Sequence, residues 1–517
     1  MDISFENEKY CSLKKNYETT VEESVEAELS LPEYMPEILR ILKSCAVPKI
    51  NSWQTVGERV TVDGTCELTM IYVGSDNCIY SFTGSRNFTR YTENPVFLTA
   101  EDVNVKASVK FVNCRATNTK RAEIKAGLNI TVSAFSKLEE DILLLESCHD
   151  IQEKKMELST MSLGCKKSKM FSMSDTFELE NNSAAFIVRS SATAVLGEVR
   201  KISNKIMLKG ETIIDIAFVP HEDKTTIKTI RKNLPINQIL EFDGMDERFT
   251  GDITLNVTAV DVIIKNDSQG DGKSLDVGVT INAGVTMWEP KDLSVITDAY
   301  AINGSIDLNY KKMKFYSALA AVRDTYIFKS TIDSSKLGAE YILDSCCEEG
   351  EPVVTLENGA IIISGTIKAM LILKDTSGGF VTTEKMLDYR YERSCESENK
   401  KIQCTPQVTV SSFECSLKNS EQIDVKAELQ INCSVFAETE IDVVSGVSEL
   451  KESEKIVKSA ITVYFPRYEE TLWDIAKRYN TTVESIVLEN NLSCDTTKDV
   501  KMLFIPSGTW IKRHSIV

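Results

Sequence analysis

The sequence predicts a mainly β protein, in which three tandem antiparallel β-sandwich or barrel-like repeats precede a small α+β module of βααβ type. Two observations predict this fold class. Strand-like stretches with alternating apolar residues recur three times along the chain, without amphipathic helices between them. Helical periodicity is clear only near the C-terminus, within residues 471–490.

Each repeat contains a strand-like stretch centred on a glycine, which is Gly64, Gly210 or Gly365. β-branched residues alternate along the chain on both sides of that glycine. This pattern predicts a half-buried strand with a bulge or a bend at the glycine. The glycines are about 150 residues apart, which is too long for a solenoid repeat and indicates tandem domains.

A second block of alternating residues follows later in each repeat. The three blocks are residues 122–135, 275–288 and 423–436. In the third block the apolar residues on one face are Ile423, Val425, Ala427, Leu429, Ile431, Cys433 and Val435. Long alternating strands of this kind are typical of antiparallel sandwiches and barrels.

These blocks predict the domain boundaries. The first repeat, with an N-terminal arm, is expected at residues 1–150, the second at 176–300 and the third at 301–440. Two stretches are expected to be linkers, because residues 151–175 are polar and basic and residues 441–460 are charged. The βααβ module is expected at residues 461–507.

Composition excludes several function classes. The chain of 517 residues has 77 acidic and 59 basic side chains, a net charge of −18, which argues against binding nucleic acid or anionic membrane surfaces. No stretch approaches the roughly 20 apolar residues of a membrane span, so direct membrane insertion is not expected. The N-terminal M-D-I-S-F-E-N-E-K-Y contains no apolar run typical of a signal peptide, so a cytoplasmic location is expected.

No motif indicates catalysis. His149, His221 and His514 are far apart in sequence, and the phosphate-binding, dinucleotide-binding and nucleophile-elbow patterns do not occur. The fourteen cysteines form no Cys-x-x-Cys pair and are expected to be buried free thiols. The adjacent Glu469 and Glu470 are interpreted as a solvated turn. We therefore expect no enzyme, metal or cofactor, and a glycan hydrolase is only a remote alternative.

The C-terminal module shows the signals of each of its elements. Ile461, Val463 and Phe465 alternate as in a short strand. Thr471 with Asp474 predicts a capped helix, and Thr481 with Glu484 predicts the cap of a second helix. One apolar face of the first helix is formed by Leu472, Ile475, Ala476 and Tyr479. The closing strand is predicted at residues 503–505.

The stretch T-L-W-D-I-A-K-R-Y-N-T-T-V-E, with N-N-L after it, resembles a LysM domain. LysM domains usually carry Pro-Gly-Asp before the Thr-Leu pair, whereas this chain has P-R-Y-E-E at residues 466–470. In glycan-binding LysM domains that turn borders the groove for N-acetylglucosamine chains. The departure from the family pattern therefore counts against sugar binding.

The first helix is also the predicted binding surface. Trp473 and Lys477 are one helical turn apart, on the side opposite the apolar face. A solvent-facing tryptophan beside a lysine is typical of an interface anchor. The predicted partner-binding residues are Ile461, Arg467, Tyr468, Trp473 and Lys477. The alternative is that Trp473 packs against Trp510 or the preceding repeat and merely covers the module.

Three β repeats, with L-P-E-Y-M-P-E-I-L at residues 31–39 and a LysM-like module behind them, resemble the SipL-like spore coat morphogenetic proteins of clostridia. Their repeats are called SPOCS domains. The resemblance implies a non-enzymatic scaffold in the mother cell that binds the coat ATPase SpoIVA, engages other coat proteins and directs coat assembly around the forespore. The alternative is a protein that binds peptidoglycan or N-acetylglucosamine through the LysM-like module.

Overall fold

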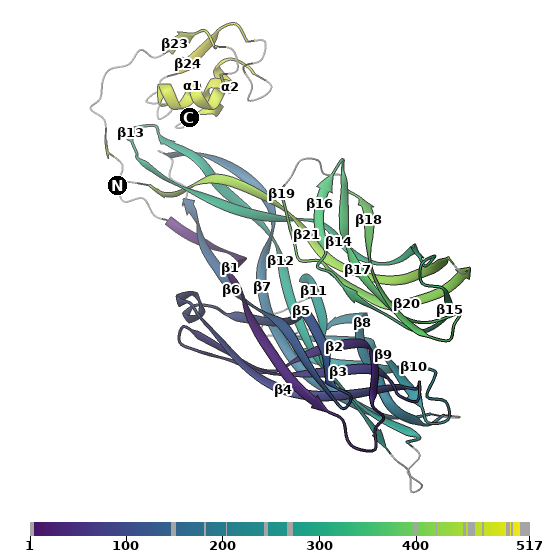
Figure 1. The fold of residues 1–517 in the computed structure, drawn as a ribbon. Helices are drawn as coiled ribbons and strands as arrows, with labels where there is room; N and C mark the ends of the chain where they lie inside the picture. Colours follow the sequence, from purple (N-terminus) through teal and green to yellow (C-terminus); the bar gives the residue numbers. More distant parts are fainter. Residues whose placement is uncertain are drawn as a thin grey trace.

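The computed structural model confirms the mainly β fold, with two short helices near the C-terminus. It describes residues 5–145, 151–179, 182–202, 204–241, 247–265, 272–395, 401–419, 421–447, 451–452, 461–467, 470–492, 497 and 500–506. Three β-sheet repeats form the body of the molecule, and the C-terminal module lies at one end of it (Figure 1). Among the described residues, no helix is long and apolar enough to cross a membrane.

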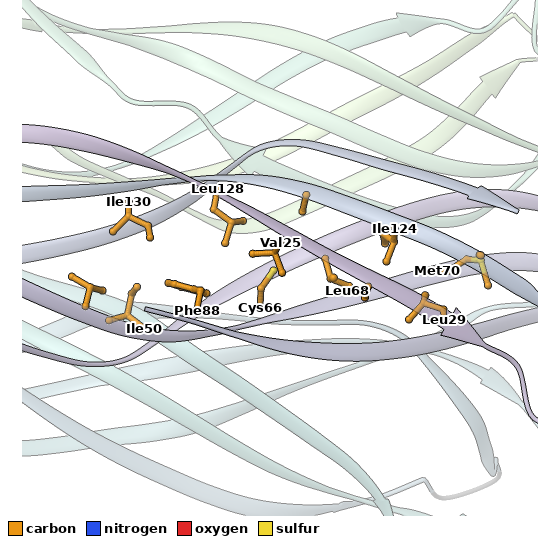
Figure 2. Close-up of a cluster of buried hydrophobic side chains, with 14 of the residues drawn as sticks. Val25, Leu29, Ile50, Cys66, Leu68, Met70, Phe88, Ile124, Leu128 and Ile130 are labelled. Carbon is orange, nitrogen blue, oxygen red and sulfur yellow. The ribbon is translucent and has the colours of Figure 1, made fainter. Parts of the chain in front are cut away.

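The first repeat is a sandwich of two three-stranded antiparallel sheets. The strands β1 (Phe5–Ser30), β6 (Arg121–Leu145) and β5 (Asp102–Asn118) form one sheet in that order. The strands β2 (Ile38–Val56), β3 (Arg59–Gly74) and β4 (Ile79–Glu93) form the other sheet, and the short 3-10 helix η1 (Pro95–Leu98) follows β4. Apolar side chains from both sheets meet between them, including Leu29, Leu68, Phe88, Leu128 and Ile130 (Figure 2).

The second repeat has the same plan. Its sheets are β11 (Thr250–Lys265), β12 (Ser274–Ala301) and β7 (Ile151–Glu178), and β10 (Lys228–Glu241), β9 (Lys205–Pro220) and β8 (Ala184–Ile202). The predicted linker at residues 151–175 is therefore wrong, because these residues form most of β7 and pair with β12. An edge strand exposes many polar side chains, which gave this segment the composition of a linker.

The third repeat divides its strands more finely. One sheet contains β14 (Leu308–Asp333), β21 (Gln422–Val447), β19 (Lys401–Cys404) and β20 (Gln407–Asn419). The other contains β15 (Ala339–Glu349), β17 (Ala360–Asp375), β16 (Val353–Glu357) and β18 (Phe380–Ser394). β21 continues to Val447, so the predicted linker does not begin at residue 441, and most of residues 448–460 lie outside the described part. Residues 451–452 form β22 (Lys451–Glu452), which pairs with β13 (Gly304–Ser305).

Packing explains why position 64 in the first repeat is a glycine. Gly64 lies opposite Phe88 in β4, and a Cβ atom at Gly64 would lie 2.2 Å from the Phe88 ring. On the other side of Gly64, the register of β2 shifts between Ile50 and Ser52. The first repeat therefore has a bulge beside Gly64, but in the neighbouring strand β2 and not in the strand of the glycine, where it was predicted.

The long strand pairs β1–β6, β7–β12 and β14–β21 pack against one another in a region that we call the stem (Figure 1). Ile142, Val295 and Val443 occupy matching positions in the three pairs and belong to one buried cluster. Tyr10 lies in the same cluster, and its hydroxyl accepts a hydrogen bond of 3.1 Å from the Tyr316 amide. The repeats therefore share a hydrophobic core in the stem.

Twelve cysteines lie within the described residues, and all twelve are free. Cys11, Cys66 and Cys433 are buried as expected, whereas the others are half-buried. Burial raises the pKa of Cys66 to about 11 and that of Cys433 to about 12, which keeps both protonated at neutral pH. Within the described part of the chain, no three His, Cys, Asp or Glu residues are arranged to hold a metal ion.

The C-terminal module consists of β23 (Ile461–Tyr464), α1 (Leu472–Tyr479), α2 (Val483–Glu489) and β24 (Leu503–Pro506). The capping box of Thr471 and Asp474 at α1 is confirmed. The predicted cap of α2 is wrong by one residue, because the Thr482 hydroxyl, and not that of Thr481, accepts the Ser485 amide. Asn480 ends α1 in a left-handed conformation, so the chain turns there and leaves Thr481 buried before the cap.

Candidate functional site

The C-terminal module is seated on the second repeat. Tyr300, near the end of β12, is 5% exposed and belongs to the same buried cluster as Leu472, Ile475 and Ile486 of the module. Its hydroxyl donates a hydrogen bond of 2.7 Å to the carbonyl of Thr481. The second repeat therefore supplies part of the hydrophobic core that holds the module in place.

Asp298 is the polar centre of this contact. Its carboxylate accepts hydrogen bonds from Trp473 Nε1 at 2.8 Å and from Lys477 Nζ at 2.6 Å. The Tyr310 hydroxyl donates a third, at 3.1 Å. Burial alone would raise the pKa of Asp298, but these hydrogen bonds outweigh it and lower the pKa. Asp298 is therefore a carboxylate at neutral pH and attracts the Lys477 ammonium.

The face of α1 that carries Trp473 and Lys477 is thus turned toward the second repeat. The Trp473 ring meets the Tyr300 ring edge-on, with 5.0 Å between the ring centroids. Asn480, just after α1, donates a hydrogen bond of 3.0 Å to the Ala301 carbonyl. Trp473 therefore covers the module as in the alternative, but it packs against the second repeat and not against the third, which precedes the module in sequence; Trp510 lies outside the described residues. Partner binding through Trp473 and Lys477 stays a prediction.

The sheet of the module has one apolar face exposed to solvent. Ile461, Val463 and Phe465 point outward from β23 and its continuation, with exposed fractions of 42%, 52% and 66%. Phe504, opposite Val463 in β24, is 39% exposed. We call these four residues the sheet face. Leu503 and Ile505 point the other way, into the core beneath the two helices.

The remaining predicted site residues lie beside the sheet face or outside the described part. Arg467 is exposed, just after Phe465. Tyr468 lies outside the described residues, so its prediction stands as made. Sequence reasoning found Ile461 but missed Val463, Phe465 and Phe504. The alternation of residues 461–465 was the available signal, although alternation alone does not say which face is buried.

The turn before α1 is not the solvated turn that we expected. The Glu470 side chain is 7% exposed and pairs with Arg478 at 2.7 Å. It also accepts hydrogen bonds from the Tyr464 hydroxyl at 2.8 Å and from the Arg467 amide at 3.1 Å. Burial would raise the pKa of Glu470, but these donors lower it, so the carboxylate is ionised. The turn is filled by this network; Glu469 lies outside the described residues.

We expect Trp473→Glu to release the module from the second repeat while both remain folded. The new carboxylate would lie beside Asp298, where like charges repel, and the Trp473 side chain is only half-buried. Small-angle X-ray scattering should show a larger radius of gyration than for the wild type. Trp473→Phe keeps a ring against Tyr300 and serves as the control. An unchanged radius of gyration in Trp473→Glu would contradict this account of the contact.

Two family models match the chain. The model described as SipL, SPOCS domain matches residues 37–117, which cover β2, β3, β4 and most of β5 in the first repeat. The LysM domain model matches residues 467–501, which contain both helices of the module. The domain pair is that of a SipL-like protein.

The SPOCS and LysM domains fit a protein of sporulation and the spore coat, and both are non-catalytic domain families. No curated protein and no solved structure matches the chain significantly. The SPOCS match lies in the first repeat, and the strand pairing of the second repeat follows the same plan. The C-terminal module, which contains the LysM match, has an exposed apolar face and a defined seat on the second repeat.

Proposed function

We propose that the chain is a non-enzymatic scaffold of the spore coat, which acts in the mother cell at the forespore surface. Its LysM domain binds the coat ATPase SpoIVA through the sheet face, and the SPOCS repeats engage other coat proteins, so that coat assembly is directed around the forespore. The observation that carries this proposal is the exposed apolar sheet face on a domain that is firmly seated elsewhere.

The sheet face has the properties of a protein-docking surface. Exposed apolar side chains gathered on one small sheet favour association with another protein, because burial removes them from water. Ile461, Val463 and Phe465 extend along one strand, and in the described residues β23 pairs only with β24. A partner that covers this strand would gain apolar contacts along its length. Arg467, two residues after Phe465, is exposed and places a positive charge at the rim of the sheet face.

Peptidoglycan binding is the second candidate function, because sugar binding is common among LysM domains. The structure offers one observation against it. Glu470 fills the turn that replaces Pro-Gly-Asp, and Tyr464, Arg478 and the Arg467 amide hold its carboxylate in place. Because the Glu470 carboxylate already accepts hydrogen bonds from within the domain, it has little remaining capacity to accept hydrogen bonds from sugar hydroxyls.

We expect Val463→Glu to weaken binding of purified SpoIVA by the full chain at least about a hundredfold. The substitution puts a charge in the middle of the apolar surface, where binding would bury it unpaired. Leu488→Glu is the matched control, because Leu488 is 77% exposed on α2, away from the sheet face. Affinity is measured by pull-down and calorimetry, with insoluble peptidoglycan as a parallel ligand.

The other outcomes decide between the alternatives. Retention on peptidoglycan with no binding to SpoIVA would overturn the scaffold proposal in favour of glycan binding. Loss of SpoIVA binding in Trp473→Glu, with full binding in Val463→Glu, would move the binding surface to α1. In that case Trp473 and Lys477 would bind SpoIVA after leaving Asp298.

A further inference from the structure

The loop between β1 and β2 in the first repeat is held rigidly by hydrogen bonds to its neighbours. Its backbone is joined to the β5–β6 turn, where the Leu31 amide donates to the Lys120 carbonyl at 2.8 Å and the Ile38 amide to the Thr119 carbonyl at 2.7 Å. The Lys120 ammonium donates to the carbonyls of Glu33 and Met35. Met35, 4% exposed, anchors the loop in the core.

The second and third repeats hold the corresponding loop in the same way with different residues. In the second repeat, the Leu179 amide donates to the Lys273 carbonyl at 2.8 Å. In the third repeat, the Ser334 amide donates to the Glu421 carbonyl at 2.8 Å. The contact between this loop and the neighbouring turn is therefore made with different sequences in the three repeats, and it does not account for an exposed tyrosine at position 34.

Two side chains in this region are large and exposed. Tyr34 in the loop is 85% exposed, and Leu39, the second residue of β2 after the loop, is 62% exposed, although the backbone that carries them is fixed. Glu33, next to Tyr34, and Glu37, three residues after it, are also exposed, and within the described residues neither makes an ion pair. An exposed tyrosine ring and two exposed carboxylates on one fixed loop suit a lysine or arginine side chain, through cation–π attraction and charge pairing.

We propose that this loop is a second docking point, which takes a basic segment of another protein. Tyr34 supplies the aromatic surface, Leu39 supplies apolar contact, and Glu33 and Glu37 pair with lysine or arginine side chains of the segment. Because the loop is already fixed, binding orders little of this chain, which favours affinity. Exposed tyrosines on fixed backbone are typical anchors of protein interfaces.

The docking point is remote from the LysM domain. β1 begins near the stem and runs for 26 residues to this loop, a span on the order of 80 Å at the rise of an extended strand. In Figure 1 the LysM domain and the end of β1 lie at opposite ends of the body. The proposal is therefore independent of SpoIVA binding by the sheet face, and either can fail without the other.

The test follows Tyr34 itself, because a basic peptide will also bind elsewhere on an acidic chain. The full chain is labelled with 3-fluorotyrosine, and the Tyr34 and Tyr91 resonances are assigned with Tyr34→Phe and Tyr91→Phe. Titration with tetralysine is expected to shift the Tyr34 fluorine resonance to saturation and to leave that of Tyr91 unchanged. Tyr91 is 57% exposed but already lies under Arg59, so it serves as the internal control.

The variant Glu33→Gln/Glu37→Gln should bind tetralysine about tenfold more weakly at Tyr34, since it removes both charge pairs and keeps the shape of the side chains. Tetraglutamate should produce no shift. The proposal is overturned if tetralysine leaves the Tyr34 resonance unmoved, or if the double variant shows the same shift at the same concentration.

Discussion

Leu472→Glu is expected to unfold the LysM domain in the full chain. Leu472 is fully buried at the start of α1, in the cluster that contains Ile486, Leu503 and Tyr300. An unpaired carboxylate at this position costs roughly several kcal/mol, which is comparable with the whole stability of so small a domain. Hydrogen–deuterium exchange should show lost protection over residues 472–489, while the strands of the three repeats keep theirs.

Leu488→Glu is the appropriate comparison for this variant. It introduces the same side chain into the same domain, at a position that is 77% exposed, so protection should remain as in the wild type. If Leu472→Glu also kept its protection, the packing of α1 against the rest of the domain would have to differ from that described.

Asp344→Ala is expected to destabilise the contact between the second and third repeats by about 3–5 kcal/mol, the usual effect of leaving a buried charge without its partner. The Asp344 carboxylate in β15 accepts hydrogen bonds from both Arg189 Nη2, at 3.0 Å, and Arg189 Nε, at 3.3 Å, in β8. The Asp344 side chain is 4% exposed and the Arg189 side chain is 19% exposed. Burial would lower the pKa of Arg189, but the attraction of Asp344 raises it.

Urea denaturation with an intrinsic fluorescence readout measures this effect, and the double variant Arg189→Met/Asp344→Leu is the control. Apolar residues of similar size in both positions should recover most of the lost stability, because no charge is left unpaired. A loss below about 1 kcal/mol in Asp344→Ala, a range typical of exposed ion pairs, would show that water reaches Arg189.

Local patterns predicted the β strands well where one face is buried. The alternation around Gly64, Gly210 and Gly365 marks β3, β9 and β17, which are the central strands of their sheets. The same reasoning failed at residues 151–175. β7 is an edge strand, and its exposed lysines and serines carry no signal of the pairing with β12, which depends on residues more than a hundred positions away.

For the candidate site too, local patterns predicted some features, whereas features that depend on long-range contacts could not be predicted. Helical periodicity predicted Trp473 and Lys477 on the solvent side of α1, whereas the structure turns both toward the second repeat and half-buries Trp473. Periodicity could not show that Asp298 lies against them, because that contact joins residues 175 or more positions apart. The exposure of Val463 and Phe504 depends on which side of the small sheet the helices cover, and this is a property of the folded domain.

The shared hydrophobic core of the stem affects how the three repeats unfold and whether one of them can be lost. Tandem domains joined by linkers unfold one at a time, and one of them can be lost without harm to the others. Here Ile142, Val295 and Val443 share one buried cluster although each comes from a different repeat, so deletion of any repeat would expose the apolar side chains of the remaining two. We therefore expect the three repeats to unfold together as one cooperative unit, and we expect the loss of one repeat to destabilise the other two.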